Sequence, residues 1–460
     1  MERAVREGNP LGTERVGKLM VRYAIPRIIS IVVNSLYNMV DQIFIGQGVG
    51  YLGNAATNVI LPLSALLVAL GLLIGDGAAS YISLSLGKGD SKSAAHGVGN
   101  AVTLTIETGI VLAILFGVFL PFFCGLFGAT EASMPYALDY GYIIVLGFPF
   151  AMIDSALGSI IRADGRPRAS MAGLLIGCIT NIICDPIFIF VFRWGVKGAA
   201  WATILGQFLN AVYFIFCLFR FKTMKLKKSY FVPKADTVRR FLPLGLSSFI
   251  TQAAAVLVIV VMNNVLVSYG AQSKYGADIP LAALGISMKV SNLITGVSLG
   301  IATGIQPILG YNYGSRQYDR VKRTYKLALL SATVILAIAF VIFQVFPEQI
   351  ISIFGQESDL YMEFAVKCFR IYLCGCFMIG VGGVTGILFQ AIGKPVPAAL
   401  LSLSRQIILR IPALLIFSYF LGVEGALWAG PFSDILSGAI SLITVVGCWK
   451  KIFAGGKENV

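Results

Sequence analysis

Histidine, acidic residues and charge in general are scarce in this sequence. Its 460 residues include one histidine and 22 aspartates and glutamates, and 13% of them are charged, about half the share of an average soluble domain. The sequence has no Gly-x-x-x-x-Gly-Lys-Ser/Thr motif, which nucleotide-binding loops require. It also has no aspartate-rich diphosphate motif or metal cluster on a loop. These absences argue against a soluble domain, an internal ATP motor and an enzyme embedded in the membrane.

The eight cysteines lack the spacing of a metal site, and the closest pair is Cys374 and Cys376. We expect them to be small residues buried in apolar helices. We expect no cleavable signal peptide, because Met1 to Lys18 is polar and the first apolar run has the length of a membrane span.

Apolar residues, in contrast, dominate the chain. They make up 57% of it, and the mean hydropathy is +0.83. The apolar runs reach the length of about 20 residues that a helix needs to cross a bilayer, and they are too continuous for barrel strands. The sequence therefore predicts an all-α integral membrane protein with twelve transmembrane helices, near 19–46, 57–84, 94–121, 136–161, 168–192, 197–221, 240–268, 281–310, 324–346, 363–391, 396–420 and 424–449.

Basic residues alternate between the two sides of the predicted helices. Of the 36 lysines and arginines, 28 fall on one side, and the largest group follows the sixth helix, between Arg220 and Arg240. Basic loops stay in the cytoplasm, so this asymmetry predicts cytoplasmic termini and an even number of spans in a bacterial inner membrane. The net charge of +14 then needs no nucleic-acid partner.

Two sequence patterns recur at nearly one spacing. Arg162-Ala-Asp-Gly-Arg-Pro167 returns as Gln390-Ala-Ile-Gly-Lys-Pro395, and Gly195-Val-Lys-Gly-Ala-Ala-Trp-Ala202 returns as Gly422-Val-Glu-Gly-Ala-Leu-Trp-Ala429. The repeat predicts two pseudo-symmetric six-helix lobes of the same orientation, an arrangement in which transporters bind substrate between the lobes. The predicted parts are a cytoplasmic segment 1–18, an N-lobe 19–221, a linker 222–239, a C-lobe 240–449 and a tail 450–460.

Ionisable residues inside a membrane are costly and are candidate sites by default. Asp41 lies roughly 21 Å along the first helix and Asp185 roughly 25 Å along the fifth, at 1.5 Å per residue. Asn181 lies one turn from Asp185 on the same helix face, and Thr203 enters at a similar depth from the sixth helix. Such oxygen ligands suit H⁺ or Na⁺ rather than a soft metal. The alternative is that the two aspartates only satisfy buried backbone groups or cap a broken helix.

The second half lacks these polar groups at the positions that the repeat relates to them. Val258, Ile407, Ile411 and Gly430 stand there instead, so the predicted ion site belongs to one lobe. Several other residues are weaker candidates for substrate binding or gating. They are Glu107 and Asp154 in the first half, and Lys289, Arg405 and Arg410 in the second, where pairing with Asp434 or snorkelling of Lys289 is the simpler interpretation.

The motifs Tyr37-Asn-Met-Val-Asp-Gln-Ile-Phe-Ile-Gly46, Asn181-Ile-Ile-Cys-Asp-Pro186 and Gly198-Ala-Ala-Trp-Ala-Thr203 resemble those of the multidrug and toxic compound extrusion (MATE) family, in its DinF/MepA-like prokaryotic branch. The resemblance covers nearly the whole chain. It implies a cation or proton site at Asp41, Asn181, Asp185 and Thr203, with Pro26 bending the first helix and Tyr37 and Asn38 lining the cavity. The chain departs from the family in lacking a helix-four amide and an acidic residue on the seventh helix.

The leading hypothesis is therefore a secondary active efflux transporter, not an enzyme. It would export organic cations or drugs by H⁺ or Na⁺ antiport through alternating access, without a cofactor. The expected partners are a small amphiphilic or cationic substrate and membrane lipids, and the expected state is a monomer. The alternative is a flippase for lipid-linked oligosaccharides or other amphiphiles, which would favour a basic cavity across both lobes.

Overall fold

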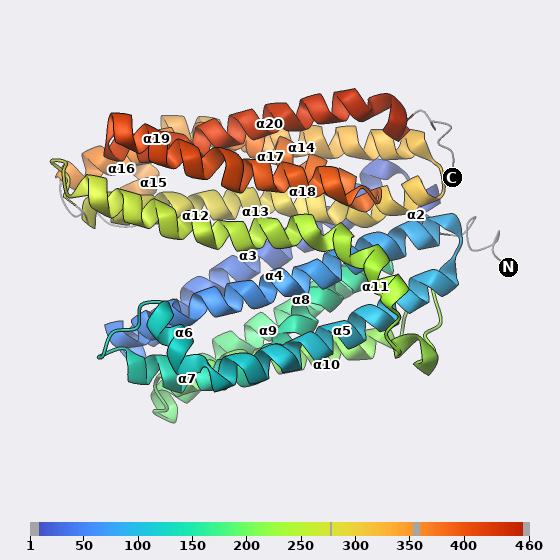
Figure 1. Ribbon diagram of the computed structural model, residues 1–460, viewed down its shortest axis with the longest axis horizontal. Helices are drawn as coiled ribbons and strands as arrows, with labels where there is room; N and C mark the ends of the chain where they lie inside the picture. The colour runs from blue at the N-terminus through green and yellow to red at the C-terminus, as the bar shows by residue number, and fades with distance from the viewer. Residues whose placement is uncertain (1–8, 277, 353–358, 454–460) are drawn as a thin grey trace.

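The computed structural model describes residues 9–276, 278–352 and 359–453 (Figure 1). These residues form helices and connecting turns, with no strand among them. The predicted terminal segments 1–18 and 450–460 fall partly outside this range, including Arg3, Arg6 and Lys457.

The helices form two bundles that lie side by side (Figure 1). The first bundle contains α3 (Val16–Gly48), α4 (Tyr51–Lys88), α5 (Ser91–Val118), α6 (Leu120–Leu126), α7 (Met134–Leu146), α8 (Phe148–Ala163), α9 (Pro167–Pro186) with the π-helical turn η1 (Ile187–Val191), and α10 (Val196–Leu218). Before it stands α2 (Pro10–Thr13).

The second bundle contains α12 (Leu246–Gly270), α13 (Asp278–Gly314), α14 (Tyr318–Val345), α15 (Pro347–Ser352), α16 (Asp359–Tyr372), α17 (Cys376–Ala391), α18 (Pro395–Leu403) with the π-helical segment η4 (Ser404–Arg410), α19 (Ile411–Leu421) and α20 (Val423–Phe453). The connection between the bundles holds η2 (Lys228–Phe231), α11 (Ala235–Phe241) and η3 (Leu242–Gly245).

Eleven helices of the described residues are long and apolar enough to span a membrane, and a bent pair makes a twelfth. The all-α membrane fold is thus confirmed. The bent pair corrects the prediction of one helix over 136–161: α7 and α8 meet at 54°. The bend falls at Gly147, and Pro149 follows in the first turn of α8, where its missing N–H costs no hydrogen bond.

Two further predicted spans are interrupted. Residues 363–391 form α16 and α17 with a break between them, and residues 396–420 pass through η4. The fifth span also changes to a π-helical turn directly after Pro186. Such π segments are uncommon in helices and often lie at functional sites. Here η1 begins two residues after Asp185, and η4 contains Arg405 and Arg410.

The bundles meet at the end that carries α2, α11 and the last turns of α20, which we call the terminal end (Figure 1). There α4 and α13 cross so closely that a Cβ on Gly87 would stand 2.1 Å from the backbone oxygen of Tyr311, and one on Gly314 would stand 2.3 Å from that of Leu84. Toward the opposite end, the ribbons of α3 and α4 diverge from those of α12 and α13 (Figure 1). Glycine thus permits a backbone contact that holds this end together.

The turns of the two halves repeat along with the sequence. Gly165 and Gly393 both have positive φ angles, of 88° and 82°, and Gly195 and Gly422 have φ angles of 57° and 63°. Each pair stands at the spacing of the sequence repeat. A left-handed turn at matched positions keeps the helices of both halves in the same order and direction.

Candidate functional site

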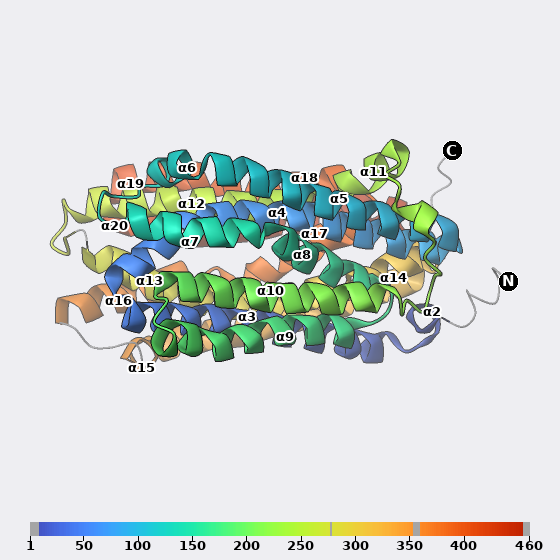
Figure 2. The ribbon, with the colours of Figure 1, turned by 90° about the horizontal axis from the view of Figure 1, so that it is seen from below.

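The most polar region of the first bundle lies where α3, α9 and α10 run side by side (Figure 2). Asn181 and Asp185 are four residues apart on α9 and therefore share a face. Both are buried, and Asp185 has no exposed surface. Pro186 follows at once and cannot donate a backbone hydrogen bond, so the helix changes its pitch beside the carboxyl group.

Asp41 reaches the same place from α3 and is 8% exposed. Its carboxyl group interacts with that of Asp185. Two carboxyl groups beside one another can share a proton, because a protonated carboxyl donates and an ionised one accepts. Oδ1 of Asp41 is buried and receives no hydrogen bond from the described residues. This oxygen can therefore still accept a hydrogen bond or a proton.

The amide of Asn181 links Asp185 to Thr203 on α10. In the orientation that satisfies both neighbours, its nitrogen donates to Oδ2 of Asp185 at 2.8 Å. Its oxygen accepts from the backbone N–H of Thr203 at 3.1 Å and from the hydroxyl at 3.2 Å. The four residues predicted from the sequence thus come together in one buried cluster, which we call the acidic cluster.

Two tyrosines complete the acidic cluster. Tyr37 from α3 and Tyr140 from α7 both lie near Thr203, and both interact electrostatically with Asp41 and Asp185. Tyr37 was among the sequence candidates, but Tyr140 was not. The sequence carries no signal for Tyr140, because a tyrosine in a membrane helix usually packs against its neighbours.

The other candidates of the first half lie apart from the acidic cluster. Pro26 lies within α3, which runs on through it without a break. Asn38 is exposed and donates to the backbone of its own helix at 2.6 Å. Asp154 is half-buried and interacts with Asn210. Glu107 lies on an exposed strip of α5 together with Ile110, Val111 and Ile114, so it points away from the bundle interior.

The second bundle holds two arginines around one aspartate. Nε of Arg405 lies 2.9 Å from Oδ1 of Asp434, and a terminal nitrogen of Arg410 lies 3.9 Å from Oδ2. The guanidinium of Arg410 also stands 6.0 Å from the ring centre of Tyr372, and its Nε is buried without a hydrogen bond to the described residues. This basic triad carries one net positive charge. Lys289 is exposed on α13.

A third buried network joins the two bundles near the terminal end. Asp76 on α4 is 4% exposed, and it accepts from Ser159 at 2.6 Å and from Ser248 of α12 at 2.8 Å. Arg162 lies 3.9 Å from the same carboxylate. Gln306 of α13 donates to the backbone oxygen of Asp76 at 3.2 Å. Because these polar groups are buried together, separating the bundles here would leave several of them without partners.

The acidic cluster offers oxygen atoms as ligands. It brings together two carboxyl groups, an amide and the hydroxyls of Thr203, Tyr37 and Tyr140. A carboxyl pair that shares one proton can gain a second or lose the first. By gaining or losing a proton, the carboxyl pair can change the net charge of the acidic cluster inside the membrane.

The sequence matches the MatE family model twice, over residues 26–187 and 248–416. It is 24% identical over 433 residues to the multidrug export protein MepA of Staphylococcus haemolyticus, which covers 93% of each chain. Two solved structures are similar in fold. One is described as MATE in the bent conformation, with a TM-score of 0.88, 22% identity and coverage of 98% and 99%. The other is an outward-facing multidrug resistance MATE family transporter, with a TM-score of 0.86, 23% identity and coverage of 97% and 98%.

Proposed function

The chain belongs to the MATE family of membrane transporters, and from that premise we propose that it exports small amphiphilic or cationic compounds in exchange for protons. Export of drugs is what the name of the staphylococcal relative states. The finer assignment, to a proton as the coupling ion, comes from the acidic cluster.

The observation that carries this proposal is the burial of Asp41 and Asp185 together in the acidic cluster. Fully ionised, the pair bears two negative charges in a poorly hydrated interior, which favours either a proton or an organic cation nearby. Fully protonated, it is neutral and has no attraction for a cation. Proton binding and cation binding therefore compete at the acidic cluster, and this competition is the basis of antiport.

The arrangement of the bundles supports alternating access. In this structure, the contact between Gly87 and Gly314 and the network around Asp76 hold the terminal end closed, while α3 and α4 diverge from α12 and α13 at the opposite end. We infer that the terminal end faces the cytoplasm, because the basic residues gather there. A cation leaving from this state departs to the outside, and protons that enter the acidic cluster displace it.

The test is transport in proteoliposomes loaded with a panel of fluorescent organic cations. We expect release of dye to accelerate when the outside is made acidic, and to be indifferent to an inward Na⁺ gradient at constant pH. Acceleration by Na⁺ alone would assign the coupling to Na⁺ and contradict the proton assignment. No response of any cationic dye to either gradient would contradict cation efflux.

A second candidate function is the movement of anionic amphiphiles, as in a flippase. The basic triad of Arg405, Arg410 and Asp434 favours it, since its net positive charge lies inside the second bundle. The same proteoliposomes test this candidate when they carry a fluorescent anionic lipid. Protein-dependent exchange of that lipid between leaflets, without transport of cationic dyes, would favour the flippase over efflux.

A further inference from the structure

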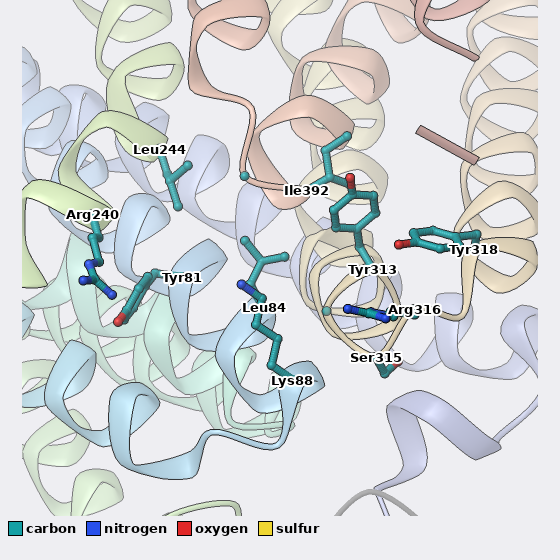
Figure 3. Close-up of a pocket in the computed structure, with 12 residues that line it drawn as sticks. Tyr81, Leu84, Lys88, Arg240, Leu244, Tyr313, Ser315, Arg316, Tyr318 and Ile392 are labelled. Atoms are coloured by element: carbon teal, nitrogen blue, oxygen red, sulfur yellow. The ribbon is translucent and has the colours of Figure 1, made fainter. Parts of the chain in front are cut away.

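A pocket of about 690 Å³ opens at the terminal end, between the two bundles (Figure 3). Its walls come from α4, α11, η3, the junction of α13 with α14, and the two residues that follow α17. The pocket lies beside the contact between Gly87 and Gly314, and none of its lining residues belongs to the acidic cluster. Its lining belongs to both bundles and to the segment that connects them.

The lining is strongly basic. Lys88, Arg240 and Arg316 contribute three positive charges, and none of the described residues that line the pocket is acidic. Figure 3 shows Arg240 beside Tyr81 on one side of the pocket, and Arg316 near Tyr313 on the other. Arg240 also pairs with Asp236 at 2.9 Å, outside the pocket lining, where both side chains are largely exposed. The charged side chains among the described residues that line the pocket are therefore all positive.

Arg316 occupies a backbone position that normally suits glycine. Its φ angle is 62°, in the left-handed region that residues with a side chain rarely adopt. The position closes the end of α13: the Arg316 N–H donates to the backbone oxygen of Tyr313 at 3.1 Å, and the Gln317 N–H to that of Asn312 at 2.8 Å. The matching position of the first half is Gly89, with a φ of 85°. The second half therefore places a guanidinium at a pocket wall where the repeat has no side chain.

Tyrosine hydroxyls complement the three cations. Tyr81, Tyr313 and Tyr318 line the same pocket from α4, α13 and α14. Guanidinium, ammonium and phenol groups all donate hydrogen bonds, and together they match an oxyanion that accepts several of them. Arginine and phosphate form especially strong, often bidentate pairs. Basic pockets between membrane helices on the cytoplasmic side suit anionic headgroups.

We propose that this pocket binds a phosphate group, carried by an anionic lipid headgroup or by a soluble phosphate compound. The bound phosphate contacts Lys88 of the first bundle, Arg240 of the connection and Arg316 of the second bundle. Because these three belong to different parts of the fold, the ligand stabilises the arrangement in which the terminal ends of the bundles are in contact. The site is independent of the acidic cluster and of the ion that drives transport.

The experiment measures binding by the full-length protein in detergent, by calorimetry and by the midpoint of thermal unfolding. The probes are sodium pyrophosphate, short-chain phosphatidylglycerol and, for comparison, short-chain phosphatidylcholine at equal concentration. We expect pyrophosphate, phosphatidylglycerol or both to bind and to raise the unfolding midpoint, with phosphatidylcholine at least about tenfold weaker, because its headgroup is neutral overall. Binding of pyrophosphate alone identifies a soluble ligand, and binding of phosphatidylglycerol alone identifies a lipid.

The decisive variant is Arg316→Gly. It removes one cation while placing glycine at a backbone position that favours it, so the fold should be kept. We expect binding of the active probe to weaken at least about tenfold, as for the loss of one charged hydrogen-bond partner. Arg240→Gln should also weaken it, whereas Arg239→Gln, at an exposed neighbour outside the lining, should not. The proposal is overturned if neither phosphate probe binds, or if Arg316→Gly binds as tightly as the unaltered protein.

Discussion

The two bundles share a scaffold but carry opposite charge at matching places. Thr203 in the first bundle corresponds to Gly430 in the second, and Asp185 corresponds to Ile411, which directly follows Arg410. A terminal nitrogen of Arg410 lies 3.1 Å from where a Cβ on Gly430 would stand. The arginine therefore reaches toward the space that the threonine side chain takes in the first bundle, and a basic triad stands where the other half has its acidic cluster.

The acidic cluster can change its charge by binding or releasing protons, whereas the basic triad cannot. The carboxyl pair of Asp41 and Asp185 gains and loses protons, whereas guanidinium groups stay charged at any physiological pH. The basic triad is thus a fixed feature of the second bundle, held by Asp434. We expect the charge of the first bundle to change with the proton gradient. The charge of the second bundle, and the electrostatic potential around it, should stay constant.

The largest effect should come from Asp41→Asn, which keeps the size of the side chain and removes its proton. We expect loss of proton-driven efflux with the protein still folded in the membrane, measured in the proteoliposome assay beside a thermal unfolding scan. Asp185→Asn should act in the same way. The double variant should be scarcely worse than the more severe single one, because groups that act as a unit are strongly non-additive.

Matched positions of the second bundle supply the control for this experiment. Val258→Leu and Ile411→Val alter packing only and should leave the ion dependence of transport unchanged. If the losses from Asp41→Asn and Asp185→Asn were independent and additive, or if the ion dependence moved in the Val258 or Ile411 variants, the coupling site would lie elsewhere.

A second large effect, on stability rather than coupling, is expected from Asp434→Asn. The change leaves Arg405 and Arg410 without their shared counter-charge. Breaking a buried ion pair by removing one partner typically costs about 3–5 kcal/mol. We expect a clearly lower unfolding midpoint in detergent, unlike the result for Asp41→Asn, and recovery with Asp434→Glu. An unaltered midpoint together with lost transport would instead place the triad in the transport pathway.

A smaller effect is expected from Thr203→Val, which keeps the shape of the side chain and removes its hydroxyl. The hydroxyl forms a hydrogen bond with the amide of Asn181 at 3.2 Å. A lost hydrogen bond of this kind costs about 1 kcal/mol, so proton-driven transport should slow roughly fivefold. Thr203→Ser should restore most of the rate. Equal rates in Thr203→Val and the unaltered protein would remove the hydroxyl from the coupling unit.

The sequence predicted the four polar residues of the acidic cluster because carboxylates are rare in apolar helices and are costly there. It could not identify Tyr140, since a phenol is ordinary in a membrane helix. It could not assign Glu107 to an exposed strip either, because an apolar helix in a membrane shows no polar face to reveal its orientation. The bend at Gly147 was missed for a related reason, since glycine and proline are common in straight membrane helices as well.

By itself, the sequence determined that the chain is a helical membrane protein with a repeated architecture, because the length of apolar runs, the placement of basic loops and the recurring turns are local properties. Only the tertiary structure decided which side chains meet. The pairing of Asp41 with Asp185, the sharing of Asp434 by two arginines, and the close crossing of Gly87 and Gly314 join residues 24 to 227 positions apart in the chain. Such contacts depend on how helices pack around one another, and helix packing is set by the shapes of many side chains at once.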